Sequence, residues 1–264
     1  MTKYWLTLAA ATTLFYHSIL LASPSDIRGT ATDTEIVLMV AGHVPGGAGS
    51  RWETDIRLVN QTSSTASVNL EFFPSGSVGN TAPALSRQVE VLAHQQTVLN
   101  RWTNIFPGAE PGIGAIRVIS DHPIVAVARV YNDQRPQGGG TFGQFVPGIP
   151  AGMARTTGVL PMLAHQEYFI GKGGFRTNIG WFNNSAHSVT LTLRVHMLHA
   201  VLVTVTREIA PFSQLQLPIG DIFGPTLEPW DQLHVTFEAT EPGLHVYASV
   251  VDNVTNDPIF VPAQ

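Results

Sequence analysis

Apolar and polar residues alternate at every second position over several stretches of the chain. In the first of these stretches, the apolar residues Val68, Leu70 and Phe72 are separated by single polar residues. The same alternation runs through residues 189–195 and 233–238. Because successive side chains of a β-strand point to opposite faces, a period of two predicts strands with one buried face.

Two further stretches are apolar almost without interruption. "PIVAVARVY" spans residues 123–131 and "LHVYASVV" spans residues 244–251, and both are predicted to be central strands. Turn-forming segments such as "FPSGSVGN" and "ATEPG" separate the strands. Residues 101–106 and 218–223 are each predicted to form one short turn of helix. Short strands with frequent turns indicate an all-β, antiparallel fold.

The chain contains the same pattern twice. "TDIRLVNQTSSTASVNLEF" at residues 54–72 resembles "TNIGWFNNSAHSVTLTLRV" at residues 177–195, and "FVP" at residues 145–147 returns at residues 260–262. The order of the matching segments is kept while their spacing drifts, as in duplicated domains with loop insertions rather than in a short-period solenoid.

This repetition predicts two tandem antiparallel β-sandwich (Ig-like) domains formed by internal duplication. The first unit is predicted over residues 36–150 and the second over residues 151–264, with a junction near residues 147–163. Residues that both copies keep, such as Asn60 and its counterpart Asn183, are predicted to serve the fold. Each closes a strand before a Ser/Thr-rich turn, where an Asn side chain can bond nearby backbone.

The first 22 residues are typical of a signal peptide. Lys3 precedes an apolar stretch that ends in small residues at Ala22, and a polar linker follows over residues 23–35. The chain is therefore expected to be secreted, extracellular or periplasmic, with no membrane contact after cleavage. The alternative is a retained membrane anchor, since the stretch is about long enough to span a bilayer.

Composition excludes several classes of function. Charged residues make up 12% of the chain and the formal net charge is -5, so a nucleic-acid partner is not expected, because phosphate binding needs clustered Lys and Arg. The chain has no cysteine, which excludes disulfides, thiolate nucleophiles and Cys-based metal sites. No cofactor is expected.

Two motifs resemble an uncharacterised tandem Ig-like β-sandwich module of secreted bacterial proteins. One is the strand "TDIRLVN" followed by a Ser/Thr-rich turn, and the other combines "YND" at residues 131–133 with "GGTFGQFVP" at residues 139–147. The second half keeps the closing "FVP" but lacks the "GTFGQ" stretch. The resemblance implies a β-sandwich fold and no known activity.

Candidate binding residues are those that the second copy does not keep. Three arginines of the first half alternate with apolar residues, which predicts one exposed face that would bind an acidic glycan or partner. They are Arg57, Arg117 and Arg129. The alternative is a solvated face whose arginines pair with nearby acids, namely Asp55, Glu71 or Glu90.

Tryptophan is the second candidate binding residue. Trp181 lies in a strand that both copies keep and is predicted to be core. Trp52, between Arg51 and Glu53, is predicted to be exposed, and an exposed indole could stack on a sugar ring. Trp52 with the three arginines would form a carbohydrate site.

Histidine offers one candidate metal site. His234 and His245 lie on strands predicted to pair as a hairpin, which would bring both imidazoles to one face for zinc. The alternative is a pair of ordinary surface histidines. His196 and His199 are three residues apart on a strand–turn–strand segment, which is unsuitable spacing for joint chelation on a strand.

Signatures of enzymes are missing. The chain has no GxSxG, no HExxH and no phosphate-binding loop. The sequence therefore predicts a secreted, non-catalytic structural or interaction protein of the cell surface or matrix, acting in adhesion or assembly. Its expected partners are proteins or glycans, and its Thr- and Val-rich strands favour self-association. The alternatives are a carbohydrate-binding module and, second, a hydrolase with a spatially assembled site.

Overall fold

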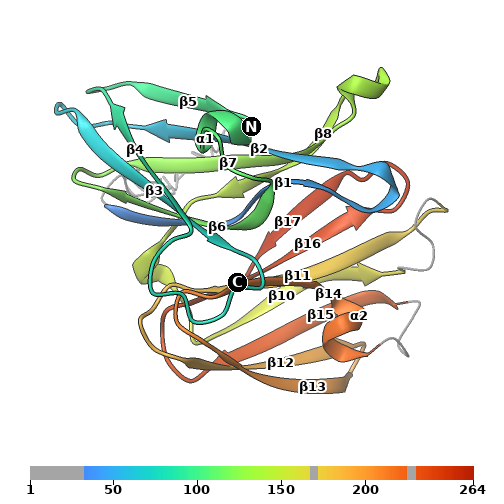
Figure 1. Ribbon diagram of the computed structural model, residues 1–264. Helices are drawn as coiled ribbons and strands as arrows, with labels where there is room; N and C mark the ends of the chain where they lie inside the picture. Colours follow the sequence, from blue (N-terminus) through green and yellow to red (C-terminus); the bar gives the residue numbers. More distant parts are fainter. Residues whose placement is uncertain (1–32, 167–171, 225–229) are drawn as a thin grey trace, which may run out of the picture. The chain divides into compact units, whose positions relative to one another are not determined.

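The computed structural model describes residues 33–166, 172–224 and 230–264 (Figure 1). These residues belong to one unit, Ala31–Gln264. The predicted signal peptide and nearly all of the predicted linker lie outside the described residues. Within the described ranges, no helix has the length and apolar character needed to cross a bilayer.

The first half of the described chain forms a nine-stranded sheet. The strands are β1 (Glu35–Pro45), β2 (Arg51–Val59), β3 (Ala66–Pro74), β4 (Leu85–Val91), β5 (Gln96–Asn100), β6 (Gly112–Ser120), β7 (Val125–Asp133), β8 (Thr141–Pro147) and β9 (Ile149–Pro150). Their order is β4-β3-β6-β1-β2-β7-β8, with β5 paired to β2 and β9 paired to β1. The helix α1 (Trp102–Ile105) follows β5, where one short turn was predicted.

The second half forms two four-stranded sheets. The strands are β10 (Thr157–His165), β11 (Phe175–Asn183), β12 (Val189–Met197), β13 (Ala200–Ile209), β14 (Gln214–Pro218), β15 (Trp230–Ala239), β16 (Leu244–Asp252) and β17 (Pro258–Pro262). One sheet has the order β10-β15-β12-β13 and the other β14-β11-β16-β17. The predicted second helical turn is α2 (Ile219–Phe223).

The strand orders of the two halves match position by position. Strands β4-β3-β6-β1 correspond to β13-β12-β15-β10, and β5-β2-β7-β8 correspond to β14-β11-β16-β17. In the first half, β1 also pairs with β2 at Val44–Trp52 and Pro45–Arg51, which joins the two groups of strands into one sheet.

All pairings between the named strands are antiparallel. The prediction of an all-β, antiparallel and sandwich-like fold is thereby confirmed. The alternating segments bury their apolar positions as expected, since Val68, Leu70 and Phe72 are buried on β3 while the residues between them are half-buried. These three residues belong to the apolar core of the first half.

The core falls into two apolar clusters. One gathers around Trp102 and Ile56 of the first half, and the other around Trp181 of the second. Phe182 of β11 and Tyr247 of β16 belong to the first cluster although they lie in the second half of the chain. Phe73 and Phe182 meet with their ring centroids 5.3 Å apart, so the two halves share apolar packing.

Hydrogen bonds also join the halves. Asn184 Nδ2 donates to Glu35 Oε1 at 2.9 Å, and Ser249 Oγ donates to Gln144 Oε1 at 3.1 Å. The Ser249–Gln144 bond is buried, so it lies inside the contact between the two halves.

Candidate functional site

A hollow lies where β1 and β7 end and β2 begins, beside the turn between β1 and β2. It has a volume of about 820 Å³. We call it the polar groove, and the lining residues that matter here are His43, Trp52, Glu53, Arg101, Asp133 and Arg135. The pairing of β2 with β7 brings Glu53 opposite Tyr131 and Trp52 opposite Asn132, which places residues distant in sequence on one rim.

Hydrogen bonds between side chains and backbone fix this end of the sheet. Ser50 Oγ donates to Gly47 O at 2.8 Å within the β1–β2 turn, and Arg51 N donates to the buried Asn132 Oδ1 at 2.9 Å. Gly46 is required at the turn because a Cβ there would collide with the Trp52 indole and with Ser50 Oγ. The turn therefore holds the indole against the groove.

Two ion pairs lie inside the polar groove. His43 Nδ1 is 2.9 Å from Glu53 Oε1, a salt bridge when the imidazole is protonated. Arg135 donates from Nε to Asp133 Oδ1 and from Nη2 to Asp133 Oδ2, both at 2.7 Å, which is the bidentate geometry that Arg and carboxylate prefer. These hydrogen bonds lower the pKa of Asp133 to about 2, so the carboxylate is ionised at neutral pH.

A second guanidinium approaches the same carboxylate. Arg101 Nη2 is 3.8 Å from Asp133 Oδ2. The backbone of Arg101 has a φ of 66°, a region that residues other than glycine rarely adopt. Its backbone N donates to Asp55 Oδ1 at 2.9 Å, which holds the unfavourable conformation in place. Strained backbone of this kind clusters at functional sites.

Tyr131 lies next to the groove and contacts one acidic and one basic side chain. Its hydroxyl donates to Asp55 Oδ1 at 3.3 Å, and the guanidinium of Arg129 lies 4.7 Å from its ring centroid. Burial, and then the nearby Asp55 carboxylate, raise the pKa of Tyr131. The phenol therefore stays neutral at physiological pH and can donate a hydrogen bond.

Trp52 is the predicted site residue that lines the polar groove. Its side chain is half-buried and packs against the core of the first half, so it is less exposed than predicted. Trp181 is fully buried, as predicted.

The structure separates the three arginines that were predicted to share one face. Arg57 on β2 and Arg129 on β7 belong to the same group of strands, whereas Arg117 on β6 belongs to the other. Arg117 donates to Glu71 Oε2 at 2.6 and 2.8 Å and lies over the Phe73 ring at 5.5 Å. The prediction of a common face is wrong because alternation shows which residues point outward but not which group of strands carries them. The alternative pairing of Arg117 with Glu71 is confirmed.

Neither Arg57 nor Arg129 lines the groove. Arg57 Nη1 donates to the carbonyl of Ile56 at 2.9 Å, and Arg129 Nη2 donates to Thr141 Oγ1 at 2.8 Å. Arg129 supports the groove indirectly through its contact with Tyr131.

The two candidate metal ligands lie in different sheets. His234 is on β15, which pairs with β10 and β12, and its ring stacks on that of His196 at 4.5 Å. His245 is on β16, which pairs with β11 and β17. The predicted hairpin is wrong because the connection after β15 crosses between sheets. Among the described residues, no group of three or more His, Cys, Asp or Glu is placed to hold a metal ion.

Sequence reasoning missed most of the polar groove. Glu53 and Asp133 are 80 positions apart, and only the β2–β7 pairing brings them to the same end of the sheet. One signal was present: "YND" and "GGTFGQF" were singled out as motifs, and Tyr131 and Asp133 belong to the first. In the second motif, a Cβ on Gly143 would collide with Tyr131, so this glycine allows β8 to pack closely on β7.

Comparisons with known proteins do not assign this chain to a family. No family model matches the chain, and no curated protein matches it. Among solved structures, it is similar to a GH2 beta-galacturonidase from Eisenbergiella tayi bound to galacturonate, with 14% identity and a TM-score of 0.20. The match covers 89% of this chain and 44% of that chain, so this chain spans less than half of that enzyme's length. A TM-score this low does not establish a shared fold, and the family resemblance stays a prediction.

Proposed function

We propose that this protein is a secreted, non-catalytic binding protein of the cell surface or matrix, and that carbohydrate is the ligand of its polar groove. The observation that carries the proposal is the indole of Trp52 lining a groove beside side chains already paired with one another. An indole face stacks on the C–H face of a sugar ring, while paired carboxylates and guanidiniums bond its hydroxyls. Because these groups are held before binding, little conformational entropy is lost on binding.

The charge of Asp133 argues against its use as the general acid of a glycosidase. A glycosidase needs a carboxylic acid whose pKa is raised so that it can donate a proton to the leaving group. The hydrogen bonds from Arg135 instead lower the pKa of Asp133 to about 2. Asp133 is therefore suited to accepting hydrogen bonds and not to general-acid catalysis at neutral pH.

We also propose that residues 36–150 and 151–264 are duplicated units, as the sequence repetition predicts. The matching strand orders support this proposal. So do Asn60 and Asn183, whose side chains make corresponding bonds. Asn60 Oδ1 accepts from Thr62 N and Oγ1, and Asn183 Oδ1 accepts from Ser185 N and Oγ.

Replacing Trp52 by alanine should weaken glycan binding at least tenfold, because truncating a central aromatic anchor typically costs about 2 kcal/mol or more. A glycan array would first identify the bound sugar, and calorimetry would then compare Kd values. Phe145→Ala is the matched control, since Phe145 is an aromatic residue on β8 that is 62% exposed and lies outside the polar groove. An array without any binding, or equal Kd values for wild type and Trp52→Ala, would contradict the proposal.

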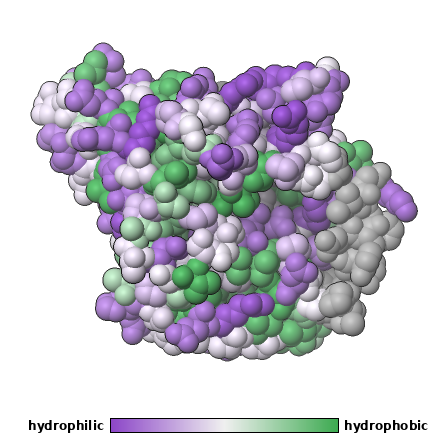
Figure 2. Space-filling model, viewed as in Figure 1, coloured by the Kyte–Doolittle hydropathy of each residue, from purple (hydrophilic) through white to green (hydrophobic). Residues whose placement is uncertain are grey.

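Self-association is a second candidate function, favoured by β13. This strand is the last in its sheet, so one backbone edge has no strand partner among the described residues. Val201 on β13 is 51% exposed, and the face shown in Figure 2 intersperses hydrophobic with hydrophilic residues. Exposed edge strands of this kind pair with other chains unless charges block them.

Val201→Lys should therefore shift wild-type oligomers towards monomer, because a lysine on an edge strand opposes strand pairing. Analytical ultracentrifugation over a concentration series measures this shift. Val254→Lys, at a 60% exposed position in the turn before β17, is expected to leave the oligomers unchanged. A wild-type chain that stays monomeric at all concentrations would rule out assembly through β13.

A further inference from the structure

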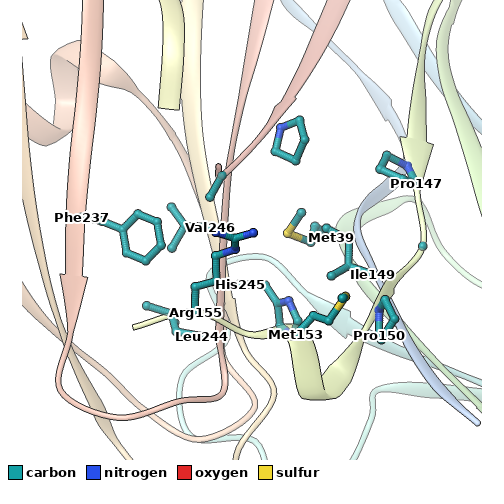
Figure 3. Close-up of a pocket in the computed structure, with 13 residues that line it drawn as sticks. Met39, Pro147, Ile149, Pro150, Met153, Arg155, Phe237, Leu244, His245 and Val246 are labelled. Carbon is teal, nitrogen blue, oxygen red and sulfur yellow. The ribbon is translucent and has the colours of Figure 1, made fainter. Parts of the chain in front are cut away.

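A second, smaller pocket lies apart from the polar groove and shares no lining residue with it. Its volume is about 300 Å³. We call it the apolar pocket, because most of its wall is hydrophobic; the side chains that matter here are Met39, Ile149, Met153, Phe237 and Val246 (Figure 3). They come from β1, β9, the short 3-10 turn Ala151–Met153, β15 and β16.

Two nitrogen-bearing side chains also line this pocket, Arg155 and His245. In Figure 3 they lie between the side formed by Phe237 and the side formed by Met39 and Ile149. Both side chains can donate hydrogen bonds, and Arg155 is a permanent cation. No carboxylate is among the residues that line the pocket.

His245 is the unusual member of the pair. Its side chain lies on a central strand, opposite Phe182 of β11, and the residue is only 4% exposed. Its Nε2 atom is buried and has no hydrogen-bond partner among the described residues. Buried side-chain nitrogens nearly always have a partner, and one left without a partner is costly. A bound group in the apolar pocket would supply that partner.

Arg155 has no acidic partner among the residues that the structure describes. It lies in the segment that joins the 3-10 turn to β10, and no described acidic side chain is within ion-pair distance of its guanidinium. A guanidinium beside an apolar cavity is suited to bind a planar anion with two parallel hydrogen bonds.

We infer that the apolar pocket binds a small molecule that has an apolar body and one carboxylate. The carboxylate would bind between Arg155 and His245 Nε2–H, and the apolar body would lie against Met39, Met153 and Phe237. A volume of about 300 Å³ is at the lower limit of ligand pockets, which favours a single ring or a short acyl chain. Methionine adapts its shape to such groups.

The charge of His245 agrees with this ligand. Burial lowers its pKa to about 4, so the imidazole is neutral at pH 7 and can donate one N–H without adding a second positive charge. The single positive charge of Arg155 then neutralises the single negative charge of the carboxylate. The inference does not depend on the carbohydrate proposal, because no residue is shared between the two sites.

The test uses phenylacetate, benzoate and hexanoate with the full chain whose methionine methyl groups carry ¹³C. Titration should shift the methyl signals of Met39 and Met153 and leave that of Met162, which is 77% exposed and outside the pocket, unchanged. Phenylacetamide has the same shape without the charge, and it should bind at least tenfold more weakly.

Variants assign the two polar partners. Arg155→Gln should weaken phenylacetate binding at least tenfold, and Arg155→Lys should recover part of the loss because the charge returns without the planar fork. His245→Phe fills a similar volume without the donor and should also weaken binding, whereas Trp52→Ala should have no effect. No shift of Met39 or Met153 with any carboxylate, equal binding of acid and amide, or unchanged affinity in Arg155→Gln would each overturn the inference.

Discussion

Replacing Asn60 by alanine is expected to lower the free energy of unfolding by about 3–4 kcal/mol, a large fraction of the stability of a typical domain. The side chain is buried, and its Nδ2 donates to Ser64 O at 2.7 Å and to Val91 O at 2.9 Å. Its Oδ1 accepts from Thr62 N and Thr62 Oγ1. Alanine would remove all four bonds, including the buried one to Val91 O, and a buried group left without a partner costs about 1–3 kcal/mol.

Asn183→Ala should have a similar effect in the second half. Asn183 Nδ2 donates to three carbonyls, those of His187, Ile209 and Ala210. Both asparagines thus tie the end of a central strand to the turn that follows and to a strand that does not pair with it, β4 for Asn60 and β13 for Asn183. Two changes of similar size would be expected if the two positions are structural equivalents.

Urea unfolding followed by circular dichroism measures both effects. Asn104→Ala is the matched control, because Asn104 is exposed on α1, and it should change the free energy of unfolding by less than about 0.5 kcal/mol. Asn60→Asp separates the two functions of the amide, since a carboxylate still accepts from Thr62 but cannot donate to Val91. A loss below about 1 kcal/mol in Asn60→Ala would contradict the structural role.

The asparagines were predictable from sequence because their role is local. Each bonds its own Ser/Thr-rich turn, and repetition at Asn183 of the pattern around Asn60 marks both as scaffold. The strands were predictable for the same reason, since alternation is a local property of the chain. Even Trp181 could be assigned to the core because it lies in a repeated strand.

Features that depend on strand partners were not predictable. Alternation indicates that Arg117 points outward, but not that Glu71 of the neighbouring strand would bind it. It likewise places His234 and His245 on strands without showing that these strands belong to different sheets. The polar groove arises where β2 pairs with β7, and the apolar pocket combines residues from Met39 to Ala263. Both sites are formed by strands that are far apart in the sequence, so no short segment of the sequence reveals either of them.

Lowering the pH from 7 to 4 should cost the folded protein up to about 3 kcal/mol through His245 alone. Burial lowers the pKa of this imidazole to about 4, from an ordinary value of 6.5. Between these two values the unfolded chain binds a proton that the folded chain does not, so stability falls as the pH falls. The difference of about 2.5 pH units corresponds to about 3 kcal/mol, most of it lost between pH 6.5 and 4.

Urea unfolding of wild type and His245→Phe at pH 7, 5.5 and 4 tests this prediction. The stability of the variant relative to wild type should rise by up to about 3 kcal/mol over that range, because phenylalanine takes up no proton. Asp133 and Asp252, whose pKa values are lowered, lose their stabilising effect at still lower pH in both proteins, so they cancel in the comparison. Val250→Ala, on the same strand, removes buried apolar surface without a titrating group and should run parallel to wild type. Since the same neutral imidazole is the proposed hydrogen-bond donor of the apolar pocket, a His245→Phe curve that also runs parallel would show that His245 titrates normally in the fold.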